Sequence, residues 1–252
     1  MTSRFRDMLK DRLNRQEVYR SSDYWDKKAA EHAGDAVSMW PNNHLNYYYH
    51  REQMAVMERF LPDLHGLDVL DFCCGTGRMS RYLAARGAHV LGIDFSHKAI
   101  EIAREISSGD NPTFRLQSIY ELEERNRFEL ALTWASTTVA CSNREDLLNV
   151  LTRVRKAIRP GGHVLLGEPV HKGFLHRVLN MRAGEYCAVM NEAGFKILAV
   201  RHLHFWPMRL LLAFVPWPRF ITAAGFYAGK AIMLLAGNKA FGDYKVFYAR
   251  VE

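Results

Sequence analysis

The chain has 252 residues, of which 48% are hydrophobic, 24% charged and 12% aromatic. This composition is typical of a globular protein and excludes a disordered, collagen-like or disulfide-scaffold chain, while the length fits one large domain or one core with an insert. The formal net charge of +7 favours a nucleic acid, an anionic membrane or an acidic substrate as partner.

The cysteines favour a reducing compartment and no structural metal. No two of the four are separated by the two-residue gap typical of zinc ligands, so no metal is expected. Cys73 and Cys74 are adjacent, and Cα atoms about 3.8 Å apart lie below the usual span of a disulfide. The N-terminus runs into charged residues without an apolar signal region, so we expect a cytoplasmic protein.

Residues 1–62 are predicted to form a helical N-terminal cap. Apolar residues recur there at helical spacing without strand alternation. They form two stripes, one of Phe5, Met8, Leu9 and Leu13 and the other of Met54, Met57 and Leu61.

Residues 63–252 are predicted to form the main α/β domain, with an apolar insert at about 203–241 before the last strand. Short apolar runs alternate with helical stretches, a pattern typical of a mostly parallel, doubly wound sheet with helices on both faces. Seven strands are expected, at residues 67–72, 89–93, 113–117, 128–134, 163–167, 196–202 and 245–251.

Capping residues mark two helix boundaries. Ser142 begins a capping-box sequence, and its helix is expected to run to about Arg159 before Pro160-Gly161-Gly162 stops it. Gly194 is expected directly after the helix that precedes the sixth strand.

The most informative segment, residues 69–80, is a buried strand that ends in a glycine turn and opens a helix. Gly75 and Gly77 allow the backbone to approach a ligand closely. Asp94 ends the second strand nineteen residues after Gly75, where an acid can accept both hydroxyls of a ribose. A dinucleotide oxidoreductase would share this arrangement, but Ser80 stands where its fingerprint needs a third glycine.

Three segments in this order resemble the class I S-adenosylmethionine-dependent methyltransferases, over roughly residues 67–252. They are Leu70-Asp71-Phe72-Cys73-Cys74-Gly75-Thr76-Gly77, Gly92-Ile93-Asp94-Phe95-Ser96 and Ile158-Arg159-Pro160-Gly161-Gly162. The resemblance implies a Rossmann-like methyltransferase fold, S-adenosyl-L-methionine as cofactor and S-adenosyl-L-homocysteine as product. It places around the methionyl part of the cofactor the loop residues Asp71, Cys73, Gly75, Thr76 and Gly77.

The resemblance also implies the other cofactor contacts. Asp94 would hold the ribose and Phe95 would stack on the adenine. Trp134 and Ala135, at the end of the fourth strand, would pass under the transferred methyl group, although Trp134 also fits a purely structural role as a core aromatic.

Two positions depart from the family's pattern. Cys73 replaces the usual first glycine of the loop, so the turn should survive with a tighter pocket. Ser118 replaces an acid that often meets the adenine amino group, which weakens adenine recognition or leaves it to the backbone near Ile119.

The reaction implied is methyl transfer to O or N of a small hydrophobic acceptor. A base assists a hydroxyl acceptor, and the candidate is His171 beyond the fifth strand; a solvated loop histidine is the alternative. The aromatic run Tyr47, Tyr48 and Tyr49 can wall an acceptor pocket or pack on the sheet, with at least one ring facing away from the core.

Other functions remain open at this point. They are an RNA methyltransferase that uses the basic surface, a dinucleotide oxidoreductase and a non-catalytic cofactor-binding protein. Because no separate RNA-binding module is visible, a nucleic acid is not the favoured partner.

Residues 196–241 contain six cationic residues and no acid, and they are the most apolar part of the chain. Three prolines and Lys230 interrupt the apolar run, which argues against a spanning helix. One interpretation is a buried insert that completes the core. The other is a lid over the acceptor site that also touches an anionic membrane, with cations such as Arg209 and Arg219 facing outward.

Overall fold

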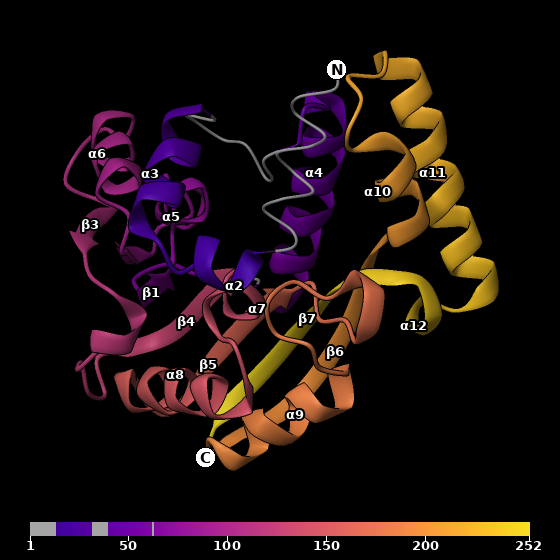
Figure 1. The fold of residues 1–252 in the computed structure, drawn as a ribbon. Coiled ribbons are helices and arrows are strands. Elements are labelled where there is room, and N and C mark those ends of the chain that lie inside the picture. Colours follow the sequence, from indigo (N-terminus) through magenta and orange to yellow (C-terminus); the bar gives the residue numbers. More distant parts are fainter. Residues whose placement is uncertain (1–13, 32–39, 62) are drawn as a thin grey trace.

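The computed structural model describes residues 14–31, 40–61 and 63–252, in which seven strands form one sheet with helices on both faces (Figure 1). The strands are β1 Asp68–Phe72, β2 His89–Asp94, β3 Thr113–Leu116, β4 Phe128–Trp134, β5 Ile158–Glu168, β6 Phe195–Phe205 and β7 Gly242–Val251. All seven coincide with predicted strands, and the predicted fold class is confirmed.

The strands lie in the order β3-β2-β1-β4-β5-β7-β6. The first five in the chain pair in parallel, whereas β7 lies antiparallel between β5 and β6. The ends of β1, β2, β4, β5 and β6 and the start of β7 therefore meet at one edge of the sheet, which we call the carboxyl edge. Ligands bind at this edge in open α/β sheets.

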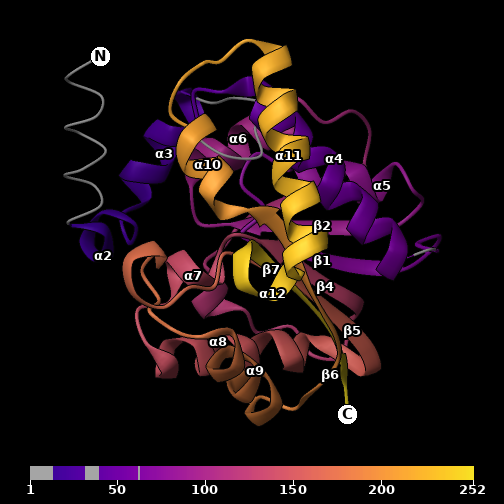
Figure 2. The same ribbon diagram turned by 90° about the vertical axis from the view of Figure 1, so that its right-hand side faces the viewer.

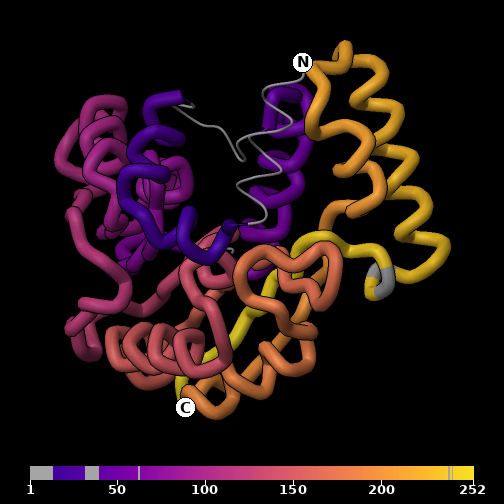
Figure 3. The backbone as a smooth tube through the Cα atoms, in the orientation of Figure 1, coloured from indigo at the N-terminus to yellow at the C-terminus, as the bar shows by residue number. Residues whose placement is uncertain are grey.

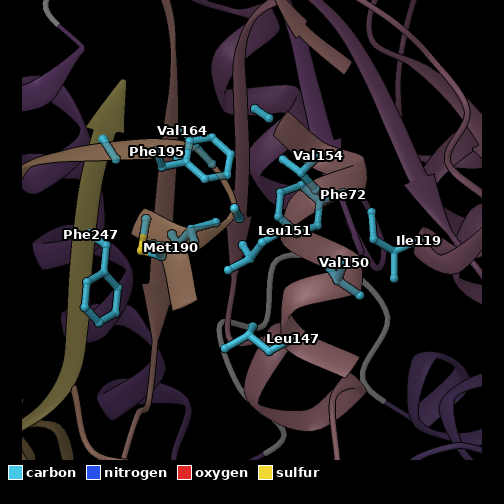
Figure 4. Close-up of a cluster of buried hydrophobic side chains, with 14 of the residues drawn as sticks. Phe72, Ile119, Leu147, Val150, Leu151, Val154, Val164, Met190, Phe195 and Phe247 are labelled. Atoms are coloured by element: carbon cyan, nitrogen blue, oxygen red, sulfur yellow. The ribbon is translucent and has the colours of Figure 1, made fainter. Parts of the chain in front are cut away.

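Two hydrophobic clusters lie on opposite faces of the sheet. Alternate residues of a strand point to opposite faces, so Leu70 and Phe72 of β1 belong to one cluster and Val69 to the other. The first cluster packs against α8 Arg144–Ala157 and α9 Ala183–Glu192, and Figure 4 shows the α8 residues facing Phe72. The second packs against α4 Asn43–Phe60, α5 Arg78–Ala84, α10 Trp206–Leu212 and α11 Arg219–Ala236.

The described part of the predicted N-terminal cap divides between two places. Helix α3 Ser22–Glu31, preceded by α2 Arg15–Val18, packs on α6 His97–Glu105, while α4 packs on α11 (Figure 3). Met54, Met57 and Leu61 are buried, as their predicted stripe requires. The stripe of Phe5, Met8, Leu9 and Leu13 lies outside the described residues.

The predicted insert forms three helices between β6 and β7, namely α10, α11 and α12 Asn238–Phe241. Helix α11 presents Phe226 to α4, where its ring stacks on Tyr48 with centroids 5.1 Å apart. Gly229 lets α11 also approach the end of β6, because a Cβ there would lie 2.9 Å from Cβ of Phe205.

Two predicted boundaries are wrong by a few residues. The N-cap of α8 is Asn143, whose side chain accepts from the Asp146 N–H, while the Ser142 N–H donates to the Asp146 carboxylate. Helix α8 ends at Ala157, and β5 already begins at Ile158, so Pro160-Gly161-Gly162 lies within the strand. Ile158 pairs with Phe128 on β4, which holds this segment extended. Gly194 follows the α9 C-cap with φ +90°, as predicted.

A methyl group at Gly167 should destabilise the fold. A Cβ there would lie 2.5 Å from the Trp134 ring across the β4–β5 ladder. Overpacking of this kind costs about 1–3 kcal/mol, so Gly167→Ala should lower the urea unfolding free energy by that amount. Gly184→Ala on α9 is the matched control, because its Cβ would meet nothing within 4 Å. Equal loss in both variants would contradict the prediction.

Candidate functional site

The loop after β1 contains three residues in the left-handed region: Cys73 at φ +54°, Gly75 at +55° and Gly77 at +78°. A side chain in this region costs roughly 1 kcal/mol or more, so Cys73 is strained where glycine would not be. Burial raises the pKa of its thiol, and the nearby Ser136 after β4 opposes that shift. The turn is kept despite the cysteine.

The two glycines of the loop serve different purposes. A Cβ at Gly77 would lie 2.6 Å from the Phe114 ring, so its lack of a side chain is required by packing. A Cβ at Gly75 would meet nothing within 4 Å. Beside Gly75 the loop therefore has free space, into which a bound molecule could approach the backbone.

Asp94 joins this loop to the end of β2. Its Oδ2 accepts from the Gly75 N–H at 2.8 Å, and its Oδ1 accepts from the Ser96 N–H at 2.9 Å. Each oxygen keeps a second lone pair, which can accept from a ribose hydroxyl. Burial raises the pKa of Asp94 although these hydrogen bonds oppose the shift.

Asp71, near the end of β1, is a second buried carboxylate. Its Oδ2 accepts from the Ser80 hydroxyl at 2.6 Å. Burial raises the pKa of Asp71 to about 7, against the lowering effects of the Ser80 hydrogen bond and the Arg78 charge. Arg78 donates to Gln53 of α4 and contacts His50, so α4 is tied to the glycine loop.

The residues implied to hold the adenine lie beside Asp94. Phe95 follows it directly and is half-buried. Ser118 lies just beyond β3, the strand paired with β2, and its hydroxyl accepts from the Tyr120 N–H at the start of the 3-10 turn Ile119–Glu121. Ile119 is buried in the first hydrophobic cluster.

The end of β4 is built around Glu168. This buried carboxylate, the last residue of β5, accepts from the backbone N–H groups of Ser136, Thr137 and Thr138. It thereby fixes the start of α7 Thr137–Ala140. Burial raises the pKa of Glu168, while the hydrogen bonds from Thr137 and Thr138 oppose the shift.

Trp134 and Ala135 precede α7 at the carboxyl edge. The Trp134 ring packs on Gly167 and lies near the Tyr244 ring, with centroids 6.5 Å apart, so it is at least partly a core aromatic. Ala135 has φ +60°, and its N–H donates to the Gly167 carbonyl. This left-handed residue turns the chain away from the sheet.

His171, the candidate base, contacts a buried acid. Its Nε2 lies 3.0 Å from Oδ1 of Asp243, and Oδ2 of Asp243 lies 2.6 Å from Nε of Arg209 on α10. Burial opposes ionisation of Asp243, but the charge of Arg209 and the hydrogen bond with His171 hold its pKa well below the usual range. Burial likewise acts against the charge of Arg209, and Asp243 raises its pKa.

The three tyrosines of α4 have different environments. Tyr47 is 46% exposed, as expected for at least one ring. Tyr48 is buried on Phe226, and Tyr49 is buried with its ring stacked on His204 at 3.6 Å. Tyr49 is close enough to Asp243 and Arg209 to feel their charges.

Sequence reasoning did not assign roles to Glu168 and Asp243, and it misplaced Arg209. Arg209 was expected to face outward, but it is buried and paired with Asp243. A signal for this pair exists, because Asp243 is the only acid between Glu192 and Glu252 and follows the cationic stretch directly. A buried acid needs a cation as its partner, and the cations of this stretch, Arg209 among them, are the ones adjacent to it in sequence.

The residues brought together fit S-adenosylmethionine. Free space beside Gly75, two buried carboxylates on adjacent strands and the open lone pairs of Asp94 match a ligand with a ribose and an amino group. All four cysteines are free thiols, and no group of three possible metal-binding side chains occurs in the described ranges.

Removing the titration of Asp71 should flatten the pH dependence of stability. Between about pH 4 and 7 the folded chain keeps a proton on Asp71 that the unfolded chain has lost, so stability falls as the pH rises. Relative to Asp71→Asn, the parent should lose up to about 4 kcal/mol of unfolding free energy across this range. Urea titrations at several pH values measure this, and parallel curves would contradict it.

The known proteins that this chain matches in sequence are named as methyltransferases. Residues 69–162 match the model of a family described as "Methyltransferase domain". A ubiquinone biosynthesis O-methyltransferase of Dechloromonas aromatica is 35% identical over 106 residues, which are 41% of this chain and 44% of the relative. A Methanocaldococcus jannaschii protein named for ribosomal RNA large subunit methylation is 42% identical over 81 residues, 32% of this chain and 19% of the relative. The chain thus spans less than half the length of these curated relatives.

The fold is shared with solved structures. Magnesium protoporphyrin IX methyltransferase from Synechocystis, crystallised with S-adenosylmethionine, superposes with a TM-score of 0.59 at 15% identity, over 96% of this chain and 97% of that chain. The prediction from the three sequence motifs is thereby confirmed: residues 69–162 carry a methyltransferase domain, and the fold is that of S-adenosylmethionine-dependent methyltransferases.

Proposed function

We propose that this protein transfers a methyl group from S-adenosylmethionine to a hydroxyl of a small hydrophobic acceptor. The observation that carries the proposal is the contact of His171 with the buried Asp243, at the same sheet edge as the glycine loop and Asp94. A histidine oriented by a buried carboxylate is suited to accept a proton. An amine acceptor, in its neutral form, would not need one.

The carboxyl edge connects the two halves of this site. Ser136, whose side chain is close enough to affect the pKa of the Cys73 thiol, donates its N–H to Glu168. Glu168 pairs across the sheet with Lys245, two residues after Asp243. The cofactor loop and His171 therefore border the same part of the carboxyl edge.

Methyl transfer to a hydroxyl needs a positioned acceptor and an exit for its proton. The bound cofactor supplies an electrophilic methyl group on a sulfonium. Asp243 accepts from Nε2–H of His171, which leaves Nδ1 able to take the proton of the acceptor hydroxyl. Arg209 keeps Asp243 ionised, so the resulting imidazolium is stabilised.

The hydrophobic acceptor is inferred from the side chains around Arg209, which pairs with the Asp243 that contacts this histidine. Trp40 lies against the Arg209 guanidinium at 6.0 Å, and Tyr49 and Tyr244 are buried close by. Aromatic walls with a few polar groups are typical of pockets for apolar small molecules.

The free thiols support a reducing cytoplasm as the place of reaction.

Loss of Asp94 should weaken cofactor binding. Asp94→Ala removes the acceptors for the ribose hydroxyls, which should weaken the binding free energy of S-adenosylhomocysteine, measured by calorimetry, by about 1–3 kcal/mol. Asp26→Ala is the matched control, because Asp26 on α3 accepts from the hydroxyl of Ser96 at 2.5 Å, whereas Asp94 accepts from the N–H of the same residue. Unchanged affinity in Asp94→Ala would show that the ribose is held elsewhere.

Loss of His171 should slow turnover without changing cofactor affinity. A general base contributes about 10²–10⁴-fold, so His171→Ala should lower kcat by that factor. Turnover is measured by mass spectrometry as the gain of one methyl group in a hydrophobic metabolite extract, with the exposed His97→Ala as control. If His171→Ala has the same kcat as the parent, His171 is not the base, and an amine acceptor is favoured.

A second candidate function is RNA methylation, favoured by the match to the protein named for ribosomal RNA methylation and by the charge of +7. RNA binding would weaken steeply with salt, because bound phosphates release counterions. Supplying total RNA beside the hydrophobic extract separates the two functions, since labelled methyl groups would enter only one of them.

A further inference from the structure

Helix α11 exposes an apolar face that the described residues 14–31, 40–61 and 63–252 leave uncovered. Figure 2 shows α11 on the outside of the molecule, beyond α4 and α10. We call the following residues the outer face: Phe220, Tyr227, Leu234 and Leu235 of α11, which are 73%, 53%, 78% and 89% exposed, with Leu211, Phe214 and Val215 before it. Large apolar side chains gathered at this exposure mark an interaction surface.

The opposite face of α11 fixes the helix to the domain. Thr222, Phe226, Gly229 and Met233 recur at helical spacing and are buried. The Asn42 side chain donates to Thr222 at 3.1 Å, and also to the Leu212 carbonyl at the end of α10. The helix is therefore attached along its length.

This attachment decides how α11 can meet a membrane. Its 18 residues are long and apolar enough to cross one, and only 22% of them are buried. A helix docked by one face cannot leave the domain without exposing that face and its hydrogen bonds. It can lie parallel to a bilayer surface with the outer face in the headgroup boundary.

The charged residues of the insert itself all have one sign. Residues 196–241 contain no acid, and the exposed cations Arg219 and Lys239 stand just at the start and just after the end of α11. Lys230 is paired with Glu52, and Arg209 is buried, so neither belongs to this fringe. An apolar stripe flanked by cations complements an anionic bilayer, whereas in a second copy of the chain the same cations would face each other.

We infer that the outer face docks on an anionic membrane surface. The inference is independent of the methyl acceptor, but it has a structural link to the site. Helix α10, which carries Arg209, ends beside the exposed Leu211 and Phe214, so the docked segment adjoins the partner of Asp243. Docking would bring the candidate acceptor site next to lipid.

Co-sedimentation tests the inference without any variant. The full chain is mixed with vesicles of phosphatidylcholine alone or with about 30% phosphatidylglycerol. We expect recovery with the anionic vesicles that weakens as salt increases. Equal recovery in the supernatant with both vesicles would overturn the inference.

Variants locate the surface. Phe220→Ser with Leu234→Ser and Leu235→Ser should lower the vesicle partition coefficient about tenfold or more. Ile106→Ser is the apolar control, because Ile106 is 44% exposed next to α6 and β3, at the opposite end of the sheet from β6. Arg219→Glu with Lys239→Glu should also lower binding, whereas Arg125→Glu with Lys156→Glu, a matched charge change at exposed positions elsewhere, should act less.

Two further measurements keep the outcome clear. Thermal unfolding and S-adenosylhomocysteine binding should be unchanged in the variants, since every substituted side chain is exposed. Sedimentation equilibrium without lipid tests the competing occupant. A dimer that the triple serine variant abolishes, together with no vesicle binding by the parent, would assign the face to a second copy and overturn the inference.

Discussion

The ion pair between Asp243 and Arg209 holds the candidate acceptor side of this protein together. Its members come from the start of β7 and from α10 of the insert, and His171 joins them from the segment after β5. A buried carboxylate costs several kcal/mol unless it is paired and hydrogen-bonded. Asp243 thus attaches the insert to the sheet and also orients His171. If α10 moved away, Asp243 would be left as a buried carboxylate without its counter-ion.

The other buried carboxylates of the carboxyl edge are satisfied differently. Glu168 and Asp94 accept mainly from backbone N–H groups, which fixes loops, while Asp71 is bonded to a hydroxyl and shares its environment with Arg78. Backbone donors cannot move away independently of the chain, so these carboxylates make the loops rigid. The carboxyl edge is consequently ordered before any ligand enters, which lowers the entropic cost of binding.

The cofactor side of the site was predictable from sequence because its determinants are local. A strand, a glycine turn and an acid at the next strand end lie within about 25 residues, and periodicity locates each of them. The acceptor side depends on pairs that are distant in the chain, such as Asp243 with His171. Periodicity carries no information on such pairs. Arg209 was therefore predicted to face outward, because a cation in an apolar helix is expected to be exposed when no partner is known. The boundaries of α8 and β5 were missed because strand pairing with Phe128 overrides the Pro-Gly-Gly signal.

The position of β7 also sets the order in which the site can be completed. Strand β6 lies at the end of the sheet, and within the described residues its one strand partner is β7, which follows it in the chain after the whole insert. Until residues 242–251 are available, β6 has no strand partner and Arg209 has no counter-ion. During synthesis β1, β2 and β4 are complete before β7, so the cofactor loop can fold early. The acceptor side can form only afterwards, when the strand that carries Asp243 pairs with β5 and β6.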